Sequence, residues 1–183
     1  GSGLAGRHVG QVLTAPALAN VERLSLADCR LGLSGYEGLV RAELPRLYDL
    51  DLTGTAPGPE GTRLLSTSRT LARLRRLRFG SNHLNRVLIA ELATCPEAEN
   101  LRVLDLGSNW VGNDGAAALA RSPHLAGLLA LGMGYAQVGD EGVGALLDSP
   151  LAEGLVLLDL RGSPASDEAK ELLRARMGDR VRL

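Results

Sequence analysis

The stretch that decides the fold is residues 101–119, LRVLDLGSNWVGNDGAAAL. Leu104 and Leu106 alternate with Val103 and Asp105, and such alternation is the period of a β-strand. After the asparagine in the ninth position the alternation stops, and a Gly-containing turn leads into an Ala-rich run of high helix propensity. The stretch therefore predicts one unit made of a short strand, a turn and a helix.

This unit returns along the chain at a nearly constant interval. Full units start at residues 21, 47, 74, 101, 128 and 155, so that successive starts are 26 or 27 residues apart. Apolar residues, most of them Leu, occupy the first, fourth and sixth positions of each unit. One unit cannot bury its apolar side alone, so stacked units must share one interior. The predicted helices cover about 35–42, 62–71, 86–93, the Ala-rich run of the fourth unit, a segment ending at 147, and 167–177.

Both ends of the chain depart from the repeat. Residues 1–3, Gly-Ser-Gly, indicate a remnant of cloning, and residues 4–20 have the pattern of a partial unit that lacks its strand. An N-terminal helical cap is the alternative interpretation, and the repeat domain as a whole spans 4–183. Residues 181–183 repeat the strand pattern early and predict a last strand that covers the sheet edge. A proline stands five residues before four of the unit starts, and we expect it to end the preceding helix.

The composition indicates a folded chain with no general affinity for nucleic acid or membrane. Apolar residues make up 45% of the sequence and charged residues 22%, which is typical of a globular protein. The net charge of −1 provides no attraction for nucleic acid or for an anionic membrane. The longest nearly apolar stretch is far shorter than the ~20 residues of a membrane-spanning helix. Cys29 and Cys95 lie at different phases of the repeat, which argues against a disulfide and favours a reducing, cytoplasmic location.

The pattern Leu-x-x-Leu-x-Leu-x-x-Asn-x-Leu, followed by Gly-Asn-Asp-Gly or Gly-Asp-Glu-Gly at the helix start, resembles the leucine-rich repeat family. The long period and the helical second half look like the ribonuclease-inhibitor type. The resemblance implies an α/β solenoid of horseshoe shape, with a parallel concave sheet, convex helices and protein binding as its usual activity. Lys170 is the single lysine, and this preference for Arg suggests a bacterial source.

The ninth position of each unit turns the chain away from the strand. An asparagine there can hydrogen-bond the backbone of its own turn and of the neighbouring turn, and Asn82 and Asn109 are expected to do so. The other units carry Cys29, Thr55, Ala136 and Ser163. Because an alanine has no polar side-chain atom, we expect looser turns at both ends of the chain than in the middle.

Strand residues between the leucines point to the concave surface. The charged residues in the third and fifth positions that we expect to contact a partner are Arg76, Arg78, Asp49, Asp51, Asp105 and Asp159. In the fifth position the sign alternates over three consecutive units. One interpretation is a set of solvated cross-strand pairs, each contributing roughly 0.2–1 kcal/mol. The other is a charged docking face for a partner with the complementary pattern.

The tenth position lies in the turn beside the sheet edge and is expected to be exposed. Trp110, the only tryptophan, and His83 occupy this position, and Tyr135 of the next unit is expected nearby. Tryptophan and tyrosine are common anchor residues in protein interfaces. We therefore interpret these three residues as a second binding patch. The alternative is that the indole ring only covers a neighbouring turn.

Catalytic and metal chemistry find little support in the sequence. The three histidines fall at different phases of the repeat and should not converge on a metal ion. Ser108, His83 and Asp105 are the one conceivable nucleophile group, but the pattern implies no pocket around them. A Gly-x-Gly at residues 132–134 lacks the third glycine of a dinucleotide fingerprint. We expect no enzyme activity, no metal and no cofactor.

The sequence thus predicts a single leucine-rich repeat domain that binds another protein through its concave face and the adjoining turns. We expect it to be monomeric in isolation and to bind neither nucleic acid nor membrane. A structural spacer or scaffold segment of a larger protein is the first alternative. A GTPase regulator is a further alternative that depends on analogy of fold alone.

Overall fold

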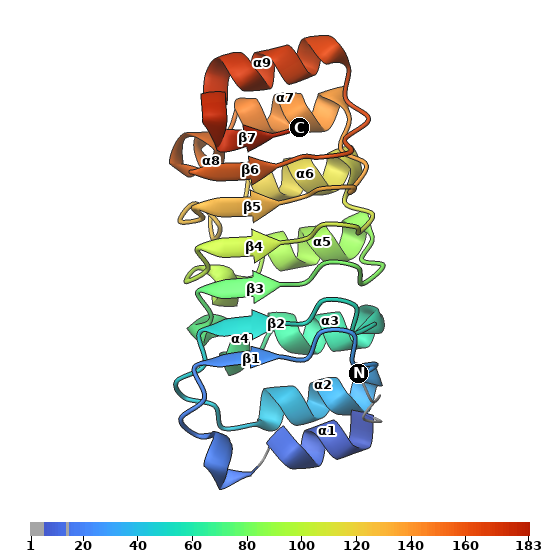
Figure 1. Cartoon of the computed structure of the whole chain (residues 1–183), viewed down its shortest axis with the longest axis vertical. Coiled ribbons are helices and arrows are strands. Elements are labelled where there is room, and N and C mark those ends of the chain that lie inside the picture. Colours follow the sequence, from blue (N-terminus) through green and yellow to red (C-terminus); the bar gives the residue numbers. More distant parts are fainter. Residues whose placement is uncertain (1–5, 14) are drawn as a thin grey trace.

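The computed structural model describes residues 6–13 and 15–183. Within them, seven strands form one parallel sheet in the order in which they occur along the chain. The strands are β1 (Arg23–Ser25), β2 (Asp49–Asp51), β3 (Arg76–Arg78), β4 (Val103–Asp105), β5 (Ala130–Gly132), β6 (Leu157–Asp159) and β7 (Val181–Arg182). Figure 1 shows them one above another along the long axis. The predicted α/β solenoid with a parallel sheet is confirmed.

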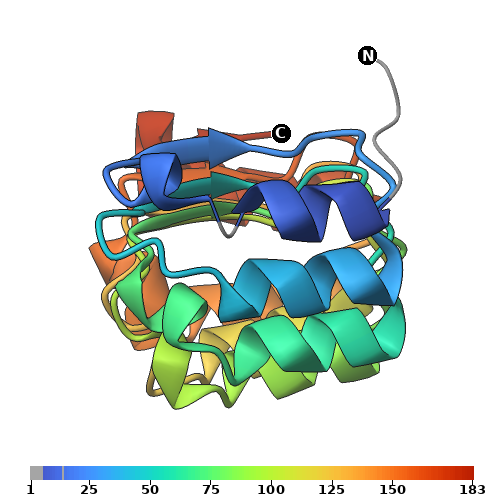
Figure 2. The same cartoon turned by 90° about the horizontal axis from the view of Figure 1, so that it is seen from below.

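The strands alternate with helices that form a second layer. The α-helices are α1 (Gly6–Leu13), α2 (Gly32–Arg41), α3 (Gly58–Ser66), α4 (Arg69–Arg73), α5 (Arg86–Ala93), α6 (Gly112–Ala120), α7 (Asp140–Leu147), α8 (Pro150–Gly154) and α9 (Asp167–Met177). The described residues also form the short 3-10 helices η1 (Pro16–Leu18), η2 (Pro96–Ala98) and η3 (Gly178–Arg180). Seen from below in Figure 2, the sheet and the helices are two separate layers.

The register of the sheet places equivalent positions of successive units side by side. The fourth-position leucines that pair across neighbouring strands are Leu24, Leu50, Leu77, Leu104, Leu131 and Leu158. From β2 to β6 these side chains are completely buried between the sheet and the helices. Each such burial contributes about 1.5–3 kcal/mol, so this row of leucines is a main source of stability. The third and fifth positions consequently face outward, and we call the surface that they form the concave face.

The single helix expected over 62–71 is wrong, because the structure divides it. Ser68 has an extended backbone, and its hydroxyl accepts a hydrogen bond from the backbone N–H of Leu71 at 3.1 Å. The same hydroxyl donates to the carbonyl of Leu65 at 2.7 Å. A serine that bonds local backbone in this way favours a helix start over a helix interior. The helix expected over 35–42 forms over 32–41, whereas those over 86–93 and 167–177 have the expected bounds.

The prolines before the units do not end the helices themselves, contrary to the expectation. The helices α1, α5, α6 and α7 end at residues 13, 93, 120 and 147, three residues before the prolines at 16, 96, 123 and 150. Three of these prolines instead begin a short helix, namely η1, η2 and α8. Proline suits the first turn of a helix, where a backbone donor is not needed. The prolines therefore start the return segment toward the next strand.

Different elements cover the two ends of the apolar interior. Val9 and Leu13 of α1 are buried, and α1 packs against α2 at the lower end of Figure 1. At the other end β7 pairs with β6, so the strand expected over 181–183 forms over 181–182. Residues 1–5, which include the expected cloning remnant, lie outside the described residues.

Candidate functional site

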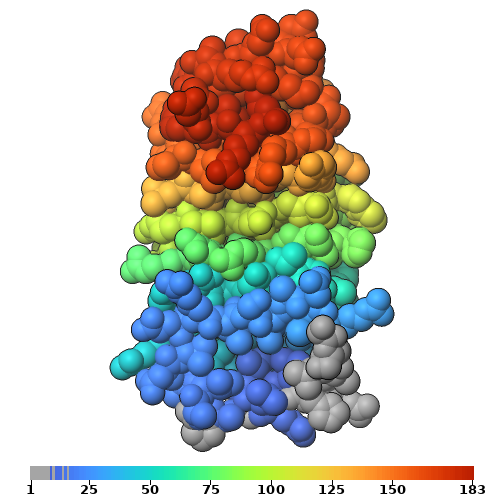
Figure 3. Space-filling model, viewed as in Figure 1, coloured from blue at the N-terminus to red at the C-terminus, as the bar shows by residue number. Residues whose placement is uncertain are grey.

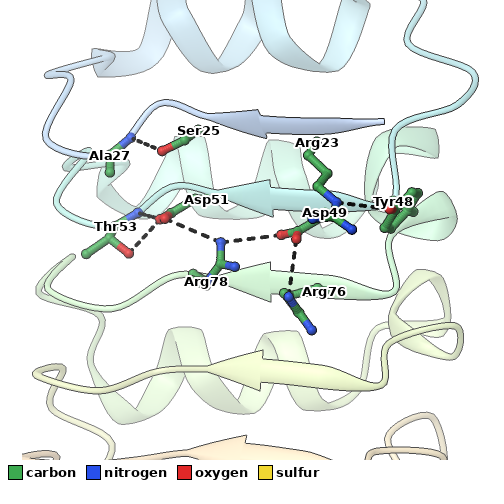
Figure 4. Close-up of polar contacts among 9 residues, drawn as sticks. All are labelled: Arg23, Ser25, Ala27, Tyr48, Asp49, Asp51, Thr53, Arg76 and Arg78. Atoms are coloured by element: carbon green, nitrogen blue, oxygen red, sulfur yellow. Dashed lines mark hydrogen bonds and ion pairs between the residues drawn. The ribbon is translucent and has the colours of Figure 1, made fainter. Parts of the chain in front are cut away.

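Charged side chains of β2 and β3 form a network on the concave face (Figure 4). Asp49 lies between two arginines: its carboxylate is 3.4 Å from Arg76 Nη1 and 3.3 Å from Arg78 Nη1. Arg78 Nη1 is also 3.4 Å from Asp51 Oδ2. Only 6% of the surface of Asp49 is exposed, so the two guanidinium groups replace water as the neighbours of its carboxylate.

At the N-terminal edge of the same face, the side chain of Arg23 contacts that of Tyr48. Its Nε donates to the tyrosine hydroxyl at 3.0 Å, and its guanidinium carbon is 5.7 Å from the ring centroid. The pKa of Arg23 is raised, first of all by this hydrogen bond. The two side chains extend the network to β1, so charged groups from three neighbouring strands are paired with groups of the protein itself.

The fifth-position aspartates have a second role that the sequence analysis missed. In Asp51, Asp105 and Asp159, Oδ1 accepts a hydrogen bond from the backbone N–H two residues later. The donors are Thr53, Gly107 and Arg161, at 3.0, 2.9 and 3.1 Å. Aspartate commonly closes a turn in this way, and its position directly before the turn was the signal in the sequence. These carboxylates therefore shape the turn in addition to charging the surface.

Asp159 also forms an ion pair within its own unit. Arg161 Nη2 lies 2.6 Å from Asp159 Oδ2, and Arg161 Nε lies 3.0 and 3.1 Å from the two carboxylate oxygens. The pKa of Asp159 is lowered, mainly by the hydrogen bonds from this guanidinium. Asp105, in contrast, has no ion pair within residues 6–13 and 15–183.

The concave face becomes apolar in its C-terminal half. The third positions of β4, β5 and β6 are the half-buried Val103, Ala130 and Leu157. Leu129 and Val156, directly before β5 and β6, are exposed, and their backbones are hydrogen-bonded to each other. The face therefore has a charged half over β1–β3 and a mostly apolar half over β4–β6.

The turns beside the sheet are connected by buried asparagines. Asn109 Oδ1 accepts from the backbone N–H groups of Asn82 and Leu84 at 3.0 Å each, and its Nδ2 donates to two carbonyls at 3.0 Å each. Asn82 repeats this arrangement one unit earlier, where Oδ1 accepts from the backbone N–H groups of Thr55 and Ala56 at 2.8 and 2.9 Å. Each asparagine thus hydrogen-bonds the preceding unit as well as its own.

The remaining ninth positions use other groups. The Thr55 hydroxyl donates to a backbone carbonyl at 2.7 Å and lies 2.6 Å from the hydroxyl of Tyr36. Burial raises the pKa of Tyr36, so this hydroxyl keeps its proton. Ser163 hydrogen-bonds the carbonyl of Val138 in the preceding unit. Cys29 is a half-buried free thiol, and among the described residues no hydrogen bond to its sulfur is found.

The structure divides the expected patch of His83, Trp110 and Tyr135 into two parts. The His83 and Trp110 rings meet edge to face, with centroids 5.9 Å apart. Trp110 is 57% exposed and lines a hollow of about 620 Å³ together with Val87 and the first residues of α6. Tyr135, which is 67% exposed, covers Gly162 of the next unit so closely that a Cβ there would lie 2.4 Å from its ring. The two large rings thus contact neighbours on opposite sides.

The conceivable nucleophile group is not assembled. Within the described residues, no hydrogen bond joins Ser108 to His83 or Asp105, because the histidine packs against Trp110 and the aspartate bonds its turn. A search of the same residues found no group of three or more His, Cys, Asp or Glu side chains placed to hold a metal ion. Among them, no helix has the length and apolar character needed to span a bilayer.

Comparison with known proteins agrees with this geometry for the central unit. Residues 98–120, which contain β4 and α6, match the model of the leucine-rich repeat family. This unit is therefore similar to a leucine-rich repeat. The strands before and after it pair in the same register, so neighbouring units repeat its arrangement.

Two further comparisons complete this result. No curated protein sequence matches the chain. Among solved structures, an internalin from Listeria monocytogenes is similar, with 15% identity, a TM-score of 0.34, and coverage of 91% of this chain and 68% of the internalin.

Proposed function

We propose that this chain is a non-catalytic module that binds another protein through the concave face and the adjoining turns. The uncovered sheet carries the proposal, because the helices lie behind the strands and no described element crosses the other side (Figures 1 and 2). In the space-filling view of Figure 3, each unit is one band of a continuous surface. A partner lying along the long axis would touch several bands at once, which is how solenoids build large interfaces.

Several finer assignments belong to the same proposal. We assign the repeats to the ribonuclease-inhibitor-like type because of their period of 26–27 residues and their helical second halves. The near absence of lysine supports a bacterial source. The two free cysteines suit a reducing, cytoplasmic compartment. The module is proposed to be monomeric until it meets its partner.

The turn edge is proposed as a second contact region. An exposed indole beside a hollow is a typical anchor for a partner side chain. Trp110→Ala is expected to weaken partner binding about tenfold or more, and Tyr135→Ala is the companion variant on the other side of the edge. Unchanged binding in both variants would remove this edge from the proposal.

A photo-crosslinking residue tests the main proposal. We would place benzoylphenylalanine at Leu157 on the concave face, and at the exposed Leu172 of α9 as the control on the helical side. The proposal predicts a saturable crosslink to one protein in an extract of the source organism from Leu157 only. Equal labelling from both positions, or none from either, would favour a spacer segment instead.

A further inference from the structure

Charges in the fifth strand position alternate in sign across the sheet, with one interruption. The register places six residues side by side from β2 to β7: Asp51, Arg78, Asp105, Gly132, Asp159 and Arg182. The order of charges is therefore negative, positive, negative, none, negative, positive. Gly132 stands where the alternation would require a positive side chain.

Asp105 consequently lacks a counter-charge on both sides. The guanidinium of Arg78 turns to β2, where its Nη1 lies 3.3 Å from Asp49 and 3.4 Å from Asp51. On the other side, Gly132 has no side chain. Among the described residues, the hydrogen bond from Gly107 to Oδ1 is the one found for the Asp105 side chain, so Oδ2 is available.

The carboxylate of Asp105 leans into the space above Gly132. A Cβ built on Gly132 would lie 2.7 Å from Asp105 Oδ1. Strands of a sheet lie about 4.8 Å apart, so the strands of Asp105 and Asp159 are separated by roughly 10 Å. We call the space left by the missing side chain of Gly132, between the strands of Asp105 and Asp159, the Gly132 gap, and Asp105 Oδ1 borders it on one side.

Arg161 does not supply the missing charge. Its guanidinium is held by both carboxylate oxygens of Asp159, at 2.6 to 3.1 Å. The pKa of Arg161 is raised by Asp159 first, and Asp105 adds to this rise at longer range. A carboxylate without an ion-pair partner at the border of the gap favours a cation there.

We propose that the Gly132 gap receives one basic side chain, an arginine or lysine, from the protein partner. The inference depends on the proposed function and names the chemistry by which the concave face recognises that partner. An arginine would pair with Asp105 in a charge-assisted hydrogen bond, which is among the stronger polar contacts in proteins. Its hydrocarbon stem would lie along the apolar third position of β5, Ala130.

Random peptides displayed on phage and selected on the whole chain provide the probe. Peptides enriched by selection are then measured by fluorescence anisotropy against the unmodified chain, Asp105→Asn and Asp148→Asn. Asp105→Asn removes the charge but keeps an oxygen acceptor for Gly107. Asp148 is the matched control, because it is an exposed aspartate directly after α7 in the helical layer, away from both the concave face and the Trp110 hollow.

The expected result is a basic residue in the enriched peptides whose replacement by alanine abolishes binding. Asp105→Asn should weaken the binding of these peptides by about tenfold to a hundredfold, whereas Asp148→Asn should not. A second variant, Gly132→Lys, places a basic side chain of the chain itself in the gap. It should weaken the binding of the same peptides although Asp105 is retained. Enriched peptides that carry no basic residue, or that bind Asp105→Asn as tightly as the unmodified chain, would overturn the proposal.

A further variant, with a bulky uncharged side chain on the concave face, tests this inference separately from the proposed function. Leu157→Trp obstructs the apolar half of the concave face without changing its charge. Peptides that lose affinity for Leu157→Trp but not for Asp105→Asn would contradict the basic side chain and leave concave binding intact. If neither variant changes the affinity, or if no peptide is enriched, both the inference and the concave-face part of the proposed function are wrong.

Discussion

The two halves of the concave face share one backbone geometry and differ in how their charges are satisfied. Over β1–β3 the charged groups have partners within the protein: the nearly buried Asp49 contacts Arg76 and Arg78, and Arg23 contacts Tyr48. Over β4–β6 the third positions are apolar, and Asp105 has no cationic neighbour in direct contact among the described residues. A partner would have to separate existing ion pairs in the first half, but it would meet free apolar surface and an available carboxylate in the second. The difference points to the C-terminal half as the main contact region.

The turns of the two halves also differ in their hydrogen bonds. Thr55, Asn82 and Asn109 form a continuous series of hydrogen bonds from unit to unit. The next ninth position, Ala136, has no polar side-chain atom, although its buried methyl group still packs in the interior. The series thus ends at Asn109, in the middle of the solenoid. Substitution of Asn109 is therefore expected to affect the stability of the fold strongly.

Asn109→Ala is expected to have the largest effect on stability. Two backbone N–H groups and the carbonyl of Leu106 lose this partner in a buried turn, whereas the carbonyl of Phe79 keeps a hydrogen bond from Asn82 Nδ2. Each group left without a partner costs about 1–3 kcal/mol. Allowing for relaxation of the turn, we expect a loss of about 3–5 kcal/mol in the free energy of unfolding, measured by urea denaturation. The control is Asn85→Ala, which removes an exposed helix cap and should cost about 1 kcal/mol. Equal losses would show that the asparagine series is not the main connection between turns.

Asp49→Ala and Asp105→Ala compare the two halves directly. Asp49→Ala leaves two arginines without their shared buried partner, and we expect a loss of about 1–3 kcal/mol. Asp105→Ala removes one hydrogen bond to a turn and no ion pair, so its cost should stay below about 1 kcal/mol. Urea denaturation of both variants at neutral pH provides the measurement. If Asp105→Ala were the more costly change, the distinction between a paired half and an unpaired half would fail.

The repeat period predicted the backbone far better than the contacts of individual side chains. The spacing of leucines was enough to place all equivalent positions in register, because only that register buries Leu50, Leu77 and the other fourth-position residues together. The repeat period could not predict with which aspartates Arg78 forms ion pairs. Arg78 lies between Asp51 and Asp105 in register, and the choice depends on the additional carboxylate of Asp49.

Local hydrogen bonds and packing contacts account for the other differences from the sequence-based expectations. The hydroxyl of Ser68 divides one expected helix into two, although its neighbours favour a continuous helix. Tyr135 covers Gly162, where the absence of a side chain leaves room for the ring. Such choices depend on a few atoms of a neighbouring unit, and they do not follow from the spacing of apolar residues.

Arg161→Ala is expected to have the smallest effect on the free energy of unfolding. The effect should show in how this free energy depends on pH. The guanidinium lowers the pKa of Asp159 in the folded chain relative to the unfolded value of about 3.9. The folded state therefore gains stability above that pH, and it loses this contribution as the pH falls through the lowered pKa of Asp159. In Arg161→Ala the gain should largely disappear, so the variant should be less stable than the unmodified chain near neutral pH. The two stabilities should converge in acid, and urea denaturation across this pH range, with NMR titration of the Asp159 carboxyl, provides the measurement. A pKa of Asp159 that stays equally low in the variant would show that its turn hydrogen bond, and not the arginine, stabilises the charge.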